Sequence, residues 1–101
     1  MTITVEGTLV RDARYGRWGA DEACITLRAT VGPNCMPFEV HAMQGKSPSD
    51  HIAAERLARN MLTGMSFRGV CGRLDVTADH GEMRYTMRDV SQVSVAGAPI
   101  V

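Results

Sequence analysis

Apolar and polar residues alternate over most of this chain, and this period of two constrains its fold more than any other feature. Residues 2–11 and 22–31 alternate cleanly, which predicts two half-buried β-strands. Residues 36–43 continue the pattern and predict a third strand. Gly7, inside the first strand, predicts a bend or a close approach of two backbones. A chain with this pattern is expected to fold around a sheet.

The period changes in one segment, residues 47–64, where it becomes helical. Ser47 is a candidate N-cap with Pro48 at the first helical position, and Ser49 is an alternative cap one turn later. Gly64 is a candidate stop. Apolar residues at spacings of three and four predict one buried stripe, made of Ala54, Leu57, Ala58, Met61 and Leu62.

Two further strands are predicted after this helix, at residues 65–76 and 82–95. Each changes its inward register once, at Arg68–Gly69 and near Asp89, and such slips are typical of β-bulges. Residues 78–81 read as a tight hairpin turn with a late glycine.

The predicted fold class is all-β with one helix. Short turns, including one at residues 32–34, join strands two and three and strands four and five, so both pairs should be antiparallel hairpins. Five strands, with the helix between the third and fourth, match the five-stranded OB-fold barrel. Bends at Gly7 and Gly69 favour this barrel over other α+β folds with the same order of elements.

Length and composition indicate one cytoplasmic domain. The 101 residues suffice for a single core over 1–101, with 96–101 as a short apolar tail. The N-terminus lacks the pattern of a signal peptide, and no apolar run approaches the roughly 18 residues of a membrane helix, so no membrane partner is expected. The three cysteines, Cys24, Cys35 and Cys71, are an odd number, which favours reduced thiols. Cys24 and Cys71 lie inside predicted strands and are expected to be buried as small apolar residues.

Several short motifs follow one another along nearly the whole chain. They are Val5-Glu6-Gly7-Thr8-Leu9 followed by Arg14-Tyr15, Ile25 to Thr30, Phe38 to His41, Val70-Cys71-Gly72-Arg73-Leu74 and Arg84-Tyr85-Thr86. Together they resemble the bacterial single-stranded DNA-binding protein family, as a short member without the family's acidic tail. Ala13 stands where the family has a proline, and Val76 where a tryptophan is common.

The resemblance implies a non-enzymatic protein of replication, recombination or repair that needs no cofactor and no metal. Its expected partners are single-stranded DNA, with RNA as an alternative, other replication proteins, and itself as a homodimer or homotetramer. A rival interpretation is an assembly module on the same fold with weak or no DNA binding. The equal numbers of basic and acidic residues, eleven each, and the few aromatic residues favour that rival.

The strongest candidate contact segment is residues 11–18, on a loop predicted over 12–21. Guanidinium groups bind phosphates, and flat rings stack under the bases of a single strand. The segment supplies both, as Arg11, Arg14, Tyr15, Arg17 and Trp18. Trp18 has an alternative role, in packing at the barrel end or in a subunit interface.

Outward strand positions add further candidates, namely Arg28, Arg73, Arg84 and Arg88, and Lys46 adds one at a turn. For each of these arginines the alternative is a solvated face balanced by Glu39, Asp75 and Asp89. Phe38 is either a stacking platform or part of the core. No metal-binding spacing occurs, and Lys46-Ser47 lacks the earlier glycine of a phosphate loop, since Val40 occupies that position.

Overall fold

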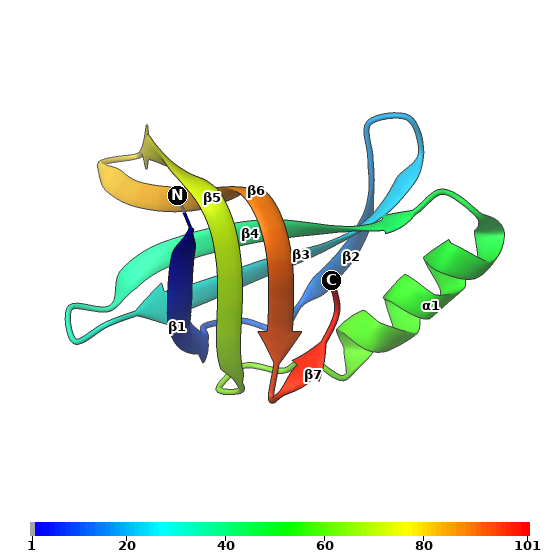
Figure 1. Cartoon of the computed structure of the whole chain (residues 1–101), viewed down its shortest axis with the longest axis horizontal. Coiled ribbons are helices and arrows are strands. Elements are labelled where there is room, and N and C mark those ends of the chain that lie inside the picture. The colour runs from blue at the N-terminus through cyan, green and yellow to red at the C-terminus, as the bar shows by residue number, and fades with distance from the viewer. Residues whose placement is uncertain (1) are drawn as a thin grey trace.

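A computed structural model describes residues 2–101 and contains seven strands and one helix (Figure 1). In chain order these are β1 (Ile3–Leu9), β2 (Arg14–Trp18), β3 (Glu22–Val31), β4 (Met36–Gly45), α1 (Pro48–Arg59), β5 (Ser66–Asp79), β6 (Glu82–Val95) and β7 (Ala98–Pro99).

The fold is therefore mostly β with a single helix, as predicted, but the strand count was wrong. Residues 12–21, expected to be a loop, contain β2, which pairs with β3 along its whole length. The helix consequently follows the fourth strand and does not lie between the third and fourth. β2 is an exposed edge strand that buries few side chains. Its segment can therefore contain two glycines and many polar residues, which is a composition typical of loops.

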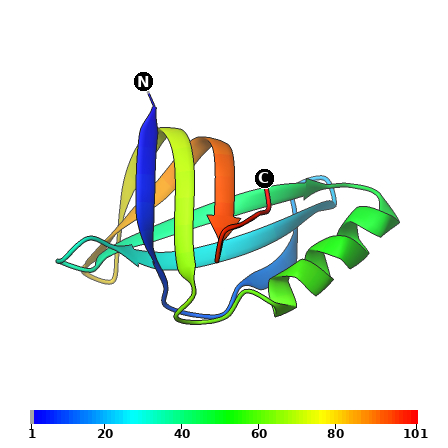
Figure 2. The ribbon, with the colours of Figure 1, turned by 60° about the horizontal axis from the view of Figure 1, so that its bottom comes forward.

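Five strands close into a hydrogen-bonded ring in the order β1, β5, β6, β4, β3 and back to β1 (Figure 2). Gly7 lies at the closing point, where it pairs with Val31 of β3 on one side and Phe67 of β5 on the other. A side chain there would overlap the carbonyl oxygen of Thr30. The predicted close approach of backbones at Gly7 is confirmed.

The two predicted hairpins are confirmed as antiparallel, β3 with β4 and β5 with β6. His80 and Gly81 form the two-residue turn of the second hairpin, and both have positive φ, as a type I′ turn requires. The slip predicted at Arg68–Gly69 is wrong. Phe67, Gly69 and Cys71 all face inward, and the irregularity lies at Val70/Cys71, opposite an extra residue of β6.

One core fills the ring, with Leu9, Ile25, Leu27, Val40 and Val93 at its centre. Cys24 and Cys71 are buried as predicted, and burial raises the pKa of both thiols. The last residues also join the core, because β7 pairs with β6 and Ile100 is buried.

The long β3–β4 hairpin extends beyond the ring (Figures 1 and 2). Outside the ring, α1 packs against this hairpin and against β2. The N-cap is Ser47 with Pro48 in the first turn, as the first of the two alternatives predicted. The helix ends earlier than expected, at the C-cap Asn60, so Gly64 is not its stop and Leu62 is exposed. In the described residues, no helix is long and apolar enough to span a membrane.

Replacing Ser47 with alanine should lower the free energy of unfolding by about 1 kcal/mol. The Ser47 hydroxyl accepts a hydrogen bond from the Asp50 backbone amide, and the Asp50 carboxylate accepts one from the Ser47 amide. Ser49, whose hydroxyl contacts that of Ser47 without capping the helix, provides the control in Ser49→Ala. Equal losses for both variants in urea denaturation would contradict the role of this cap.

Candidate nucleic-acid interface

A row of polar side chains, three of them charged, crosses the face of the sheet that lies opposite the core. Arg28 on β3 faces Glu39 on β4, and Glu39 lies beside Thr86 on β6. Thr86 in turn faces Asp75 on β5. Arginines gather around this row, and we call them the arginine face: Arg11, Arg14, Arg28, Arg73, Arg84 and Arg88.

Glu39 lies at the centre of one half of this face. Its Oε1 accepts a hydrogen bond from Nε of Arg28 at 2.9 Å, and its Oε2 lies 3.3 Å from Nε2 of His41. Burial alone raises the pKa of Glu39, but the hydrogen bond from Arg28 and the charges of His41, Arg28 and Arg84 outweigh it. The pKa of Glu39 therefore lies below its ordinary value, and the carboxylate stays ionised beside the arginines.

Arg11 approaches the same cluster from the segment between β1 and β2. Its Nε is buried and has no hydrogen-bond partner within residues 2–101. Burial and the charges of Arg28 and Arg14 lower the pKa of Arg11, while Glu39 partly offsets them. Several guanidinium groups thus share one carboxylate, which leaves an excess of positive charge for an anion to neutralise.

Replacing Glu39 with glutamine should remove part of the acid sensitivity of folding. Because the folded pKa of Glu39 is depressed, its ionised form adds stability above the unfolded glutamate pKa of about 4.3, and this stability is lost as pH falls through the folded pKa. Urea denaturation of both proteins at pH 6 and pH 3 measures the difference. The parent should lose more stability than Glu39→Gln, and equal losses would contradict the prediction.

Trp18 ends β2 beside this cluster and is 50% exposed. Its ring lies against His41, with centroids 4.6 Å apart and planes tilted by 35°. Arg14 and Trp18 occupy alternate positions of β2 and so share one side of the strand. Within the described part of the chain, Arg14 pairs with no carboxylate.

Tyr15 and Arg17 lie on the opposite side of β2, because the segment is a strand and its side chains alternate. Nε2 of His51 donates to the carbonyl of Asp21 at 2.8 Å, so Nδ1 accepts from the Tyr15 hydroxyl at 2.5 Å. This hydrogen bond between Tyr15 and His51 links β2 to α1. Arg17 forms an exposed ion pair with Asp21, four residues ahead.

Lys46 also lies away from the arginine face. It lines a shallow hollow of about 340 Å³ between β2 and α1, together with Tyr15, Arg17 and His51. The structure therefore divides the predicted contact segment between two surfaces. One surface contains Arg11 and Arg14 near Arg28 and Arg84, with Trp18 beside them. The other surface, between β2 and α1, contains Tyr15, Arg17 and Lys46.

Phe38 belongs to the core. It is 9% exposed, and its ring stacks on Tyr85 with centroids 5.0 Å apart. Of the two roles left open by the sequence, the structure places Phe38 in packing, because its side chain is buried and its ring already stacks on Tyr85.

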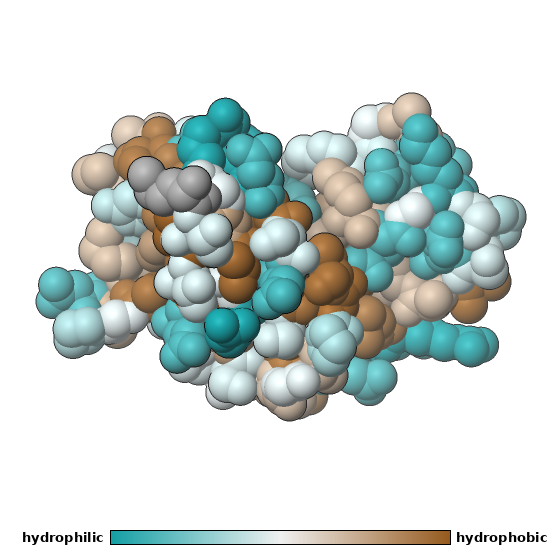
Figure 3. All heavy atoms as spheres, viewed as in Figure 1, coloured by the Kyte–Doolittle hydropathy of each residue, from teal (hydrophilic) through white to brown (hydrophobic). Residues whose placement is uncertain are grey.

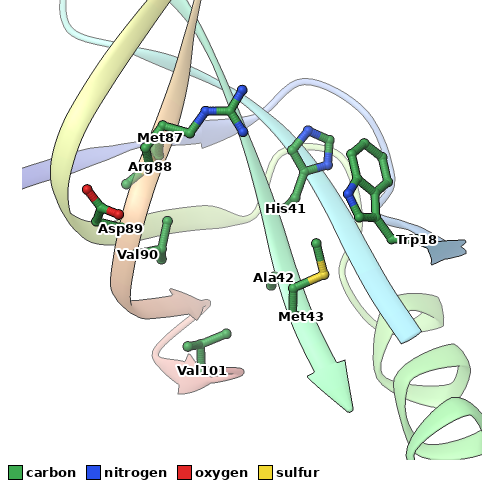
Figure 4. Close-up of a pocket in the computed structure, with 9 residues that line it drawn as sticks. All are labelled: Trp18, His41, Ala42, Met43, Met87, Arg88, Asp89, Val90 and Val101. Carbon is green, nitrogen blue, oxygen red and sulfur yellow. The ribbon is translucent and has the colours of Figure 1, made fainter. Parts of the chain in front are cut away.

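Arg73 and Arg88 form the other half of the arginine face, around Asp75. Nε of Arg73 and Nε of Arg88 donate to the two oxygens of Asp75 at 3.1 and 3.0 Å. All three side chains are well exposed, so these pairs add little stability but orient both guanidinium groups. Beside Arg88 a pocket opens toward Trp18 and His41 (Figure 4).

Sequence reasoning placed Arg88 among the outward arginines and Glu39 among the acidic residues that balance them, but it missed His41 as part of this site. The turn predicted at residues 32–34 could have revealed these cross-strand neighbours. A short turn there determines the hairpin register, which puts Arg28 opposite Glu39 and Thr26 opposite His41. The proximity of Arg88 to the β4 side chains needed tertiary information, because the parallel contact between β4 and β6 joins segments some 47 residues apart.

The chain matches no protein-family model, and a search of curated proteins finds no significant match. Among residues 2–101, no group of three or more histidine, cysteine, aspartate or glutamate side chains could hold a metal ion.

Proposed function

We propose that this protein binds single-stranded DNA without reading its sequence, on a five-stranded OB-fold barrel. The strand ring closed at Gly7, with one helix before its last hairpin, supports the barrel. The observation that carries the function is the arginine face, on which six guanidinium groups gather around two carboxylates beside an exposed tryptophan.

This arrangement suits a single strand better than a duplex or a free anion. The arginines are spread over several neighbouring strands, with Arg28 on β3, Arg84 and Arg88 on β6 and Arg73 on β5, as contacts to successive phosphates require. Trp18 lies beside these arginines, against His41, with half of its surface free to stack on a base. Formal neutrality of the whole chain is compatible with this function, because Arg59, Glu55 and other charges outside the face pair with one another.

Trp18 provides its own reporter for the test. Titration with a thymidine oligonucleotide at low salt should quench its fluorescence, and the logarithm of the binding constant should fall linearly with the logarithm of salt concentration. RNA of the same length tests the alternative nucleic acid. Absence of binding to either at low salt would refute the proposal and favour the assembly module.

The Trp18→Ala variant should lose about tenfold in affinity for the oligonucleotide, because one base then lacks its stacking partner. Fluorescence anisotropy of a labelled strand measures this loss without tryptophan. Sedimentation of the free protein is the control, since a Trp18 that packs in a subunit interface would change the oligomeric state instead. Unchanged affinity in Trp18→Ala would show that no base stacks on Trp18.

A further inference from the structure

A pocket of about 280 Å³ opens at the end of the arginine face, between β4 and β6. These strands pair only at Phe38–Tyr85 and Glu39–Thr86, and beyond this point they separate. Figure 3 shows apolar surface near the C-terminal end of the chain, between the ring and α1. The side chains that shape the pocket are Trp18, His41, Met43, Arg88, Val90 and Val101 (Figure 4).

Three kinds of surface meet in this pocket. Trp18 and His41 lie side by side and form an aromatic wall. Met43, Val90 and Val101 contribute an apolar wall. Arg88 reaches from β6 across the gap toward His41 (Figure 4), while its Nε is held by Asp75. The terminal nitrogens of Arg88 thus remain as hydrogen-bond donors beside the aromatic wall.

We propose that this pocket receives one unstacked nucleobase of the bound strand. Flat rings and apolar side chains suit the faces of a base, and an arginine donor suits the carbonyl or ring-nitrogen acceptors on its edge. A phosphate alone would leave the apolar wall unused. This inference rests on the proposed function and adds to it a defined base site between β4 and β6.

The backbone of β6 also bends at this pocket. Asp89, a non-glycine residue, has a φ of 53°, and the extra residue of β6 follows within two positions. Bulges and left-handed residues concentrate beside binding sites, where they redirect neighbouring side chains. Here they set the direction of Arg88 and Val90, which precede and follow Asp89 at the pocket wall.

Methionine methyl NMR can observe the base site directly. Met43 lines the pocket and is partly exposed, whereas Met83 is exposed at the distant end of the β5–β6 hairpin and serves as the control. A thymidine oligonucleotide should shift the Met43 methyl signal and leave that of Met83 in place. An abasic strand of the same length should still bind through its phosphates but should leave the Met43 signal unchanged.

Filling the pocket tests the same inference by affinity. Val90→Phe should weaken binding of the thymidine strand about tenfold and leave binding of the abasic strand unchanged. Val70→Phe is the matched control, because Val70 is partly buried on the neighbouring strand, outside the pocket. Met43→Phe, at a more exposed position, repeats the test if Val90→Phe fails to fold.

The outcomes separate this inference from the function on which it rests. Tight binding of the thymidine strand by both pocket-filling variants, or an equal Met43 shift with the abasic strand, would overturn the base site and leave DNA binding intact. Absence of binding by the parent protein to either strand at low salt would overturn both.

Discussion

Replacing Gly7 with alanine should destabilise the protein by about 3 kcal/mol, the largest effect expected for any single methyl group added to this chain. A Cβ at Gly7 would overlap the carbonyl oxygen of Thr30, which belongs to the backbone of β3 and cannot rotate away. β1 pairs with both β3 and β5 at this residue, so relief of the overlap must open the ring.

Thermal and urea denaturation measure this loss, which corresponds to a fall in Tm of roughly 12–24 °C for a domain of this size. Gly16→Ala is the matched control. Gly16 is also in a strand, but a Cβ there would lie within 4 Å of no residue other than its two chain neighbours. Its stability should change by less than about 1 kcal/mol. Similar behaviour of both variants would show that Gly7 does not close the ring.

Removing two charges from the arginine face should abolish most of the affinity for single-stranded DNA. Arg14 and Arg84 are the suitable pair, because in residues 2–101 neither is paired with a carboxylate and their loss costs little stability. The double variant Arg14→Gln, Arg84→Gln should bind about 100-fold more weakly, at roughly 1.4 kcal/mol for each charged contact. Its salt slope should fall by about 1.4.

A second double variant, Arg56→Gln with Arg59→Gln, makes the same change in net charge on α1. Arg59 pairs with Glu55 at the helix surface, and Arg56 is exposed one turn before it. Affinity measured by anisotropy at several salt concentrations should stay within about threefold of the parent protein. Equal losses in both double variants would mean that net charge, and no particular face, controls binding.

Local patterns predicted most elements of this fold because each depends on neighbouring residues. The 82–95 strand, the two hairpin turns and the Ser47 cap were all predicted, since turn geometry and capping need only a few adjacent residues. The slip at Arg68–Gly69 was misplaced, because Gly69 faces inward where Met87 and Phe67 leave no room for a side chain.

The candidate site was harder to predict, as the segment 11–18 illustrates. Its three arginines and two aromatics read as one exposed cluster. In the structure this segment includes an edge strand, and alternation along that strand sends Tyr15 to α1 and Trp18 to the arginine face. Because this edge strand has at most one buried side chain, its apolar and polar residues do not alternate. Its β-strand period therefore could not be seen in the sequence.

The sequence by itself determined a mostly β chain with one helix, two antiparallel hairpins, and a glycine where backbones meet at Gly7. These follow from period, turn residues and the absence of a Cβ, which act over short distances. Only the tertiary structure decided which arginines share a face and where the pocket opens. Both depend on the parallel contact of β4 with β6, which brings distant segments together by closing the ring.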